Sequence, residues 1–130
     1  MAQDILIVDD NPDDIELTRV VLAELGRKER LEFAYSGDIA LQRLQRSEEL
    51  PALIFLDLKT PGMSGIDTLR RIRADERLRH IPVIIVTSSS FPQDEKEALE
   101  AGADSYLYKA FDMDKFGRDL SSLLQRFLKC

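Results

Sequence analysis

Short apolar segments alternate with helix-type patterns along the whole chain. Apolar segments with the length and composition of β-strands lie at about residues 4–9, 31–35, 52–57, 82–87 and 105–109. Between and after them, apolar residues recur at helical spacing, and the last such stretch runs from Asp112 to about Leu128. This β-α alternation predicts a doubly wound α/β fold, a parallel sheet with helices on both faces.

The polarity of the strands predicts their order in the sheet. The first, third and fourth strands are apolar throughout, as strands buried on both faces are. The second, 31–35, alternates in polarity, and the fifth begins with Ser105 and carries two tyrosines, so these two belong at the edges. The order 2-1-3-4-5, the flavodoxin-like arrangement, meets that condition. Ligands in such sheets bind beyond the carboxyl ends of the strands, between the first and third.

Length and composition narrow the classes of protein. The 130 residues fit a single domain, 1–130, with 44% hydrophobic and 32% charged residues. A net charge of −6 without a basic run argues against direct binding to nucleic acid. The chain shows no signal-peptide pattern and no apolar run near the ~20 residues of a membrane span, so we expect a cytoplasmic protein. Cys130, the single cysteine, excludes an internal disulfide.

Four strands each end in polar residues, with carboxylates after the first and third, a hydroxyl at the end of the fourth and an ammonium group after the fifth. These are the pair Asp9-Asp10, then Asp57, Thr87 and Lys109. In a parallel sheet these residues meet at the edge formed by the carboxyl ends of the strands. Two carboxylates 4 Å apart there repel each other by about 4 kcal/mol at an effective dielectric of 20. A divalent cation relieves that repulsion, and Mg²⁺ favours carboxylates together with a phosphate. The sequence therefore predicts a Mg²⁺ and phosphoryl site.

The residue types suggest a division of labour at that site. Asp57 could be the nucleophile that forms an aspartyl phosphate. Lys109 would neutralise the phosphoryl oxygens and Thr87 would donate a hydrogen bond to them. Each residue alone has an ordinary structural explanation, such as a turn or a helix cap. The combination, each type at the end of its own strand, favours the site.

Four motifs resemble those of response-regulator receiver domains, the CheY-like family, over essentially the whole chain. They are Ile-Val-Asp9-Asp10-Asn-Pro, Phe-Leu-Asp57-Leu-Lys-Thr-Pro61-Gly-Met-Ser-Gly65, Ile-Pro-Val-Ile-Ile-Val-Thr87 and Gly102-Ala-Asp-Ser-Tyr106-Leu-Tyr-Lys109. The resemblance implies a two-component phosphorelay response regulator, not an enzyme acting on other molecules, that assists its own phosphorylation and dephosphorylation. A histidine kinase would donate the phosphoryl group.

The resemblance also implies a role for individual residues. Asp57 would be the phosphorylated residue, Asp10 a direct Mg²⁺ ligand and Asp9 a mainly water-mediated one. The carbonyl of Lys59 would be a further ligand. In the conformational switch, Lys109 would sense the phosphate, and the switch pair would be Thr87 and Tyr106.

The chain departs from the family pattern at Ala110, where the family has proline after a cis peptide bond. A cis bond before a non-proline residue costs about 2.5–4 kcal/mol. Either Lys109-Ala110 is trans and the loop is rearranged, or the surrounding structure absorbs that strain. The Lys59 side chain is expected to be solvated; the alternative is that it alters the loss of the phosphoryl group, as Ser89, two residues past Thr87, could also do.

The expected partners are a histidine kinase and a downstream protein. The Asn-Pro-Asp-Asp motif and the length of the chain resemble those of regulators paired with phytochrome-type kinases. We expect no output domain after residue 130 and therefore expect output through contact with the downstream protein, at the surface formed by about residues 93–128. Leu124 and Leu128 fall off the main apolar stripe of the last helix. They are therefore candidates for a homodimer or partner contact.

Three alternatives remain open at this point. A degenerate receiver would bind partners without phosphorylation, as Ala110 mildly suggests. A phosphatase with an aspartate nucleophile needs a second carboxylate two residues on, where this chain has Lys59. A flavin-binding domain would cradle phosphate after the first strand, where acidic residues would instead repel it, namely Asp9, Asp10, Asp13 and Asp14.

Overall fold

A computed structural model describes residues 4–27, 29–88, 91–109 and 113–128 of the chain. The elements are β1 (Asp4–Val8), α1 (Pro12–Glu24), β2 (Arg30–Ala34), α2 (Gly37–Arg46), β3 (Leu53–Leu56), α3 (Gly65–Ala74), β4 (Val83–Thr87), α4 (Pro92–Glu100), β5 (Ser105–Tyr108) and α5 (Met113–Phe127). The strands form one parallel sheet in the order β2-β1-β3-β4-β5. The predicted fold class and strand order are confirmed.

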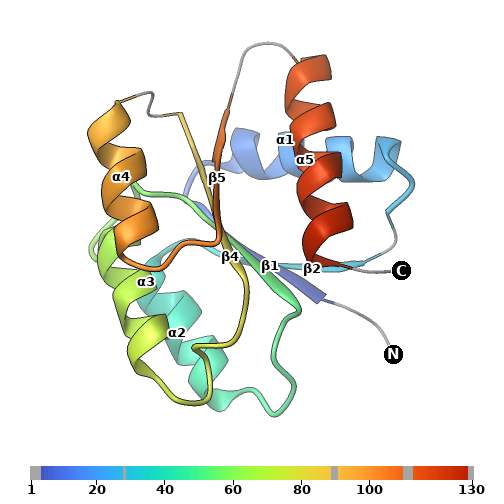
Figure 1. Cartoon of the computed structure of the whole chain (residues 1–130). Helices are drawn as coiled ribbons and strands as arrows, with labels where there is room; N and C mark the ends of the chain where they lie inside the picture. Colours follow the sequence, from blue (N-terminus) through green and yellow to red (C-terminus); the bar gives the residue numbers. More distant parts are fainter. Residues whose placement is uncertain (1–3, 28, 89–90, 110–112, 129–130) are drawn as a thin grey trace.

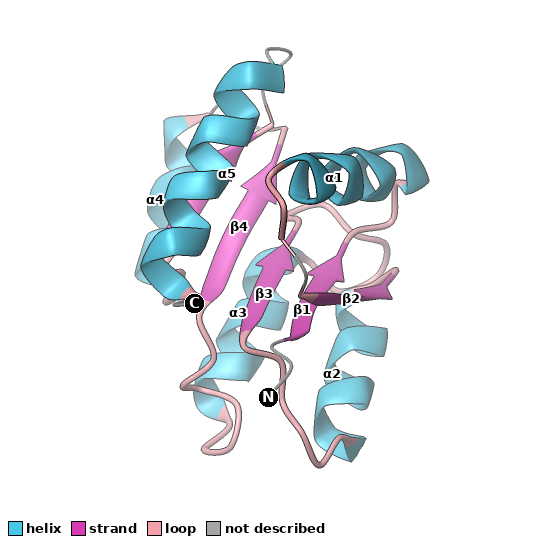
Figure 2. Cartoon of the chain, turned by 90° about the vertical axis from the view of Figure 1, so that its right-hand side faces the viewer, coloured by secondary structure: helices cyan, strands magenta, loops and turns pink. Residues whose placement is uncertain are grey.

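The helices form a layer on each face of the sheet. Helices α1 and α5 cover one face, and α2, α3 and α4 cover the other (Figure 1). Figure 2 looks onto the face that α1 and α5 cover. Successive side chains of a strand point to opposite faces, so Ile5 and Ile7 of β1 pack on the α1/α5 side while Leu6 and Val8 pack on the other. The chain therefore has a separate apolar cluster on each face.

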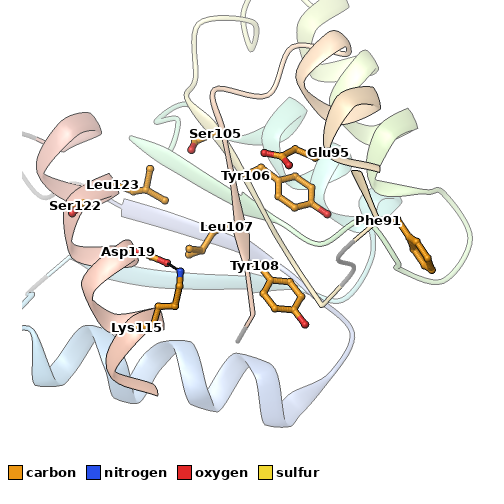
Figure 3. A pocket seen from close by; sticks show the side chains of 10 residues that line it. All are labelled: Phe91, Glu95, Ser105, Tyr106, Leu107, Tyr108, Lys115, Asp119, Ser122 and Leu123. Atoms are coloured by element: carbon orange, nitrogen blue, oxygen red, sulfur yellow. Dashed lines mark hydrogen bonds and ion pairs between the residues drawn. The ribbon is translucent and has the colours of Figure 1, made fainter. Parts of the chain in front are cut away.

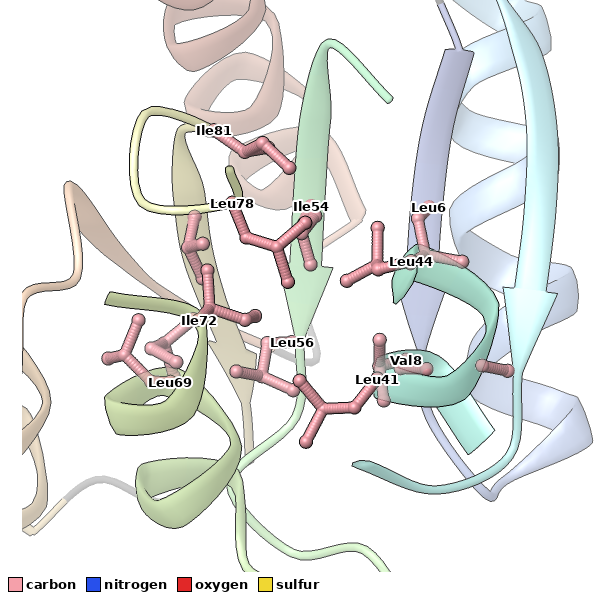
Figure 4. Close-up of a cluster of buried hydrophobic side chains, with 14 of the residues drawn as sticks. Leu6, Val8, Leu41, Leu44, Ile54, Leu56, Leu69, Ile72, Leu78 and Ile81 are labelled. Carbon is pink, nitrogen blue, oxygen red and sulfur yellow. The ribbon is translucent and has the colours of Figure 1, made fainter. Parts of the chain in front are cut away.

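The central strands are apolar at every position because both of their faces are covered. In β3, all residues are buried, with Ile54 and Leu56 facing α2 and α3. Figure 4 shows these two side chains against Leu41 and Leu44 of α2. The strand ends are thus held in place from both sides, which fixes the positions of the residues that follow them.

The burial of side chains on helix α5 contradicts one prediction. Leu124 and Leu128, expected off the apolar stripe, are 0% and 2% exposed and belong to the cluster on the α1/α5 face. The buried stripe of this helix uses a spacing of four, continuing from Phe116 through Leu120. Leu124 and Leu128 are therefore core residues, and the prediction that they form a dimer or partner contact was wrong.

Helix α1 begins and ends as its sequence indicates. The Asn11 side chain accepts a hydrogen bond from the Asp13 amide at 2.9 Å, and Pro12 occupies the first turn. Gly26 ends the helix with a φ of +73°, a conformation that side chains rarely adopt. This places the first turn of α1 directly after the acidic pair Asp9-Asp10.

Some predictions concern residues outside the described part of the chain. These are the Lys109-Ala110 peptide bond, the side chain of Ser89, the start of the last helix at Asp112, and Cys130.

None of the helices in the described part of the chain is both long enough and apolar enough to cross a membrane.

Candidate functional site

Backbone hydrogen bonds continue the sheet past the strand ends and set the site residues side by side. The Asp9 amide donates to the carbonyl of Ala34 at 3.0 Å, and the Asp57 amide donates to that of Val8 at 3.0 Å. At the ends of β4 and β5, the Lys109 amide donates to the carbonyl of Thr87 at 2.8 Å. The side chains predicted from the strand ends are thus brought to one edge of the sheet.

The acidic residues form a cluster with the donor chemistry of a divalent-cation site. Carboxylate oxygens of Asp9, Asp10 and Asp57 lie within 4.8 Å of one another. Asp9 and Asp57 are 4% and 9% exposed, whereas Asp10 is exposed. A set of carboxylate oxygens that is buried on one side and open on the other fits Mg²⁺, which takes oxygen ligands and keeps several waters.

Lys109 reaches from the end of β5 into this cluster. Its ammonium nitrogen, Nζ, lies 2.8 Å from Asp9 Oδ2, 2.9 Å from Asp14 Oδ2 and 3.1 Å from Asp57 Oδ2. An ammonium group has three hydrogens to donate, and here each has a separate carboxylate as acceptor. The Lys109 side chain is only 9% exposed, so these bonds replace nearly all of its water.

Burial and charge shift two pKa values at the site. Burial raises the pKa of Asp9, and it outweighs the opposing hydrogen bonds from Lys109 and the Asn11 amide. For Lys109, burial alone would lower the pKa. The hydrogen bonds to Asp9 and Asp14, with the charges of Asp57 and Asp9, outweigh it and raise the pKa. Lys109 therefore remains a cation.

The second oxygen of Asp57 fixes the loop that follows β3. Asp57 Oδ1 accepts a hydrogen bond from the Lys59 amide at 3.1 Å. The Lys59 residue is exposed. The main chain at Lys59 is thus held next to the acidic cluster, which is compatible with the predicted role of its carbonyl.

Asp14 is the site residue that sequence reasoning missed. The flavin-binding alternative invoked its charge, but no role was predicted for it beside Lys109. A signal was present, because α1 starts at the edge of the sheet where the site lies and Asp14 is in its first turn. Its contact with Lys109 joins residues 95 positions apart in the chain.

The predicted switch residues lie on one face of the sheet, on the α4 side. Thr87 ends β4 and is 1% exposed. It follows Ile85 by two residues, so it points to the same face, and Ile85 pairs in register with Tyr106 of β5. Tyr106 is half-buried and packs against the cluster of the α2/α3/α4 face. The two side chains are therefore on neighbouring strands and on the same face of the sheet.

Comparison with known proteins identifies the family. Residues 5–120 match the model of the response regulator receiver domain. The DNA-binding response regulator MtrA of Mycolicibacterium smegmatis is 41% identical over 112 residues, which cover 85% of this chain and 46% of MtrA. The chain thus spans about half the length of that curated relative.

Two solved structures have the same fold over nearly the whole chain. One is the receiver domain of sensor histidine kinase PA1611 from Pseudomonas aeruginosa PAO1, with a magnesium ion coordinated in the active site cleft; it has a TM-score of 0.81, 30% identity and coverage of 100% of both chains. The other is the bacteriophytochrome response regulator RtBRR, with a TM-score of 0.81, 33% identity and coverage of 95% of this chain and 78% of RtBRR. From its motifs, its fold and these matches, the chain belongs to the family of response regulator receiver domains.

Proposed function

We propose that this chain accepts a phosphoryl group on Asp57 from a histidine kinase, with Mg²⁺ as cofactor, and that phosphorylation changes its contacts with another protein. The observation that carries the proposal is the position of Asp57. Its carboxylate is buried between the acidic pair Asp9-Asp10 and the Lys109 ammonium, 3.1 Å away. The magnesium ion in the PA1611 receiver domain supports the choice of cation.

The transfer step uses groups that are already in place. A carboxylate oxygen of Asp57 forms a bond to phosphorus while the phosphorus–nitrogen bond of the kinase phosphohistidine breaks, and the bonding electrons leave with the imidazole. Lys109 offsets negative charge on the phosphoryl oxygens, and Thr87 donates a hydrogen bond to one of them. Asp10 and Asp57, with Asp9 beside them, would hold the Mg²⁺, which would supply further positive charge there. The Lys59 carbonyl completes this proposed ligand set.

The proposed output surface is the groove between α4, β5 and α5 (Figure 3). The groove has a volume of about 490 Å³, and aromatic side chains lie at its α4 and β5 walls. Phe91 and Tyr108 are 68% and 42% exposed, so two aromatic side chains are accessible to a partner at this groove. Tyr106 lines the groove and lies on the strand next to Thr87, so a shift at Thr87 would be transmitted to this surface.

We propose a phytochrome-type sensor as the kinase. RtBRR, a bacteriophytochrome response regulator, is 33% identical to this chain over the aligned part of the two chains. Pull-down of candidate kinases, followed by transfer of labelled phosphate from each kinase to this protein, tests that assignment.

Phosphorylation of Asp57 is tested with a small phosphodonor and Mg²⁺. Mass spectrometry should find one added phosphoryl group that hydroxylamine and base remove, as they do for an acyl phosphate. Asp57→Asn and chelation of Mg²⁺ should each abolish the addition. Asp67→Asn, which alters an exposed carboxylate on α3, is the matched control and should be labelled like wild type. Equal labelling of Asp57→Asn would refute the assignment.

The switch is tested by NMR with beryllofluoride, a mimic of the phosphoryl group. Chemical-shift changes should extend from the loops around Asp57 to Tyr106 and α5, and Thr87→Ala should reduce them. Moving a two-state equilibrium from 1:99 to 99:1 requires about 5.5 kcal/mol of differential binding. Changes confined to the loops around Asp57 would instead favour the degenerate receiver.

A further inference from the structure

Asp14 differs from the other carboxylates that bind Lys109. Two of the three, Asp9 and Asp57, belong to the acidic cluster that fits a divalent cation. Asp14 is outside that cluster, comes from α1, and accepts a hydrogen bond from Lys109 Nζ at 2.9 Å. Its side chain is 30% exposed, compared with 9% for that of Lys109. The ammonium group is thus shared between the cation site and a helix that lies beside it.

We propose that Asp14 is a positioning residue for Lys109, and that it keeps the ammonium group beside Asp57 when a cation occupies the acidic cluster. The inference rests on the proposed function, because it concerns the lysine that would neutralise the transferred phosphoryl group. Asp14 itself touches neither the phosphoryl group nor the metal in this proposal. It acts through Lys109.

The reason lies in how a buried ammonium group is held. A charge removed from water must be compensated by partners nearby, and Lys109 is compensated by its three carboxylates. A divalent cation at Asp9 and Asp57 offsets the charge of two of these partners and also repels the ammonium group. Asp14 is the partner that the cation leaves unchanged.

The local structure of α1 holds Asp14 in place for this role. Asn11 caps the helix through the Asp13 amide, and Thr18 Oγ1 donates to the Asp14 carbonyl at 3.0 Å. The first turn is therefore ordered by bonds that do not involve Lys109. A fixed carboxylate at this point can orient a lysine side chain, which has many rotamers of its own.

The neighbouring Asp13 provides a matched control. It has the same charge, lies in the same first turn of α1, and is exposed. It is not one of the three carboxylates to which Lys109 Nζ donates. Asp13→Asn therefore removes the same charge from the same helix end, without removing a contact to the ammonium group.

The first experiment measures the initial rate of labelling by a small phosphodonor at saturating Mg²⁺. Asp14→Asn should slow it about tenfold, the effect of replacing a charged acceptor of the ammonium hydrogen bond with a neutral amide oxygen. Asp13→Asn should change it less than about twofold. In a Lys109→Ala background, adding Asp14→Asn should have no further effect, because the residue through which Asp14 acts is gone. Additive slowing in the double variant, or a rate unchanged by Asp14→Asn, would overturn the proposal.

The second experiment does not depend on phosphorylation. The NMR cross-peak of the Lys109 Cε–Hε group, assigned by its absence in Lys109→Ala, is followed in the Mg²⁺-bound protein. Asp14→Asn and Asp14→Ala should move it toward the position of the exposed lysines, while Asp13→Asn should leave it in place. An unmoved peak in both Asp14 variants refutes the positioning role. If wild type takes up no phosphoryl group, the proposed function fails and this measurement alone decides the role of Asp14.

Discussion

Gly65 lies against the main chain of Asp57, and a β-carbon at Gly65 would fall 2.4 Å from the Asp57 carbonyl oxygen. It would also lie 2.6 Å from Leu58 Cα, whereas real β-carbons do not approach other atoms within 3.0 Å. The Gly65 amide donates to the Leu58 carbonyl at 3.0 Å, which holds this close approach. The absence of a side chain therefore lets α3 begin directly beside the proposed phosphoacceptor.

Replacing Gly65 with alanine should displace the end of β3 and disturb the site. The obstructing atoms are main-chain atoms that cannot move independently of the strand, so we expect a loss of about 1–3 kcal/mol in unfolding free energy and weaker Mg²⁺ binding. Urea denaturation and calorimetric titration measure the two effects. Gly117→Ala on α5 is the control: its β-carbon would meet Val21 Cγ1 at 3.8 Å, an ordinary contact. That helix substitution should stabilise by about 0.5–1 kcal/mol. Wild-type stability and Mg²⁺ affinity in Gly65→Ala would contradict the argument.

Magnesium should raise the melting temperature through the acidic cluster. A ligand that binds only the folded state adds about 2.7 kcal/mol of stability at 100 times its dissociation constant. Asp10→Ala should reduce this response more than Asp9→Ala, if Asp10 is the direct ligand. Circular dichroism is the measurement, since the chain contains no tryptophan. Asp67→Asn should respond to Mg²⁺ as wild type does, and an equal response in Asp10→Ala would refute its role.

The fold and the strand-end residues were predictable because they depend on local patterns. The alternating polarity of 31–35 and the polar Ser105 placed β2 and β5 at the edges, where they lie. Once the strand order is known, the residue after each strand must lie at the carboxyl edge of the sheet. The positions of Asp57 and Lys109 therefore follow from topology alone.

The remaining contacts depend on geometry that spacing does not specify. Whether a first-turn residue of α1 reaches Lys109 depends on the angle of the helix and on side-chain rotamers, so Asp14 was not identified. Which leucines of α5 are buried depends on how that helix rotates against the sheet. A stripe through Leu123 and one through Leu124 differ by one residue in the sequence, and the structure buries Leu124.

Leu124→Ala should therefore destabilise the fold and not affect association. Leu124 is 0% exposed, and removing a buried leucine side chain costs about 2–5 kcal/mol. Leu99→Ala on α4, where the leucine is 46% exposed, should change stability by less than about 0.5 kcal/mol. Thermal unfolding measures stability, and size-exclusion chromatography measures association. A change of oligomeric state in Leu124→Ala at unchanged stability would restore the dimer interpretation.

Arg73 joins the segments at the end of the sheet opposite the site. Its guanidinium group donates to the carbonyls of Gly102 at 2.9 Å and Ile81 at 2.8 Å, and to the Asp104 carboxylate at 2.9 Å. The same Asp104 oxygen accepts from the Val83 amide at 2.8 Å. One side chain of α3 thus holds the segments that precede both β4 and β5.

Loss of Arg73 should be costly because its acceptors are partly buried carbonyls. We expect Arg73→Ala to lower the unfolding free energy by about 2–3 kcal/mol, and Arg73→Lys to restore little, since an ammonium group cannot reproduce the planar set of donors. Arg70→Ala is the control. Arg70 contacts Asp67 at 3.7 Å with both side chains mostly exposed, so its loss should cost less than about 1 kcal/mol. Urea denaturation distinguishes the two, and equal costs would contradict this account of Arg73.

Because of Lys109, the unfolding free energy of the protein should fall as the pH rises into the alkaline range. The pKa of Lys109 in the folded protein is raised above 10.5, chiefly because its hydrogen bonds to Asp9 and Asp14 and the charge of Asp57 outweigh burial. The stabilisation it gives is therefore complete below pH 10.5 and is lost as pH rises toward the folded-state pKa. Relative to Lys109→Met, the metal-free wild type should lose about 1.4 kcal/mol per pH unit above that point.

Measuring unfolding free energies of the two proteins from pH 9 to about pH 12 checks the slope. Lys115→Met is the matched control, since Lys115 is an exposed lysine on α5 paired with Asp119 at 2.8 Å. Its unfolding free energy should stay within about 1 kcal/mol of wild type. A constant difference between wild type and Lys109→Met across this range would show that the contacts of Lys109 with its carboxylates do not hold the ammonium form. In that case Lys109 would not be fixed as a cation beside Asp57, and its proposed part in phosphoryl transfer would lose its electrostatic basis.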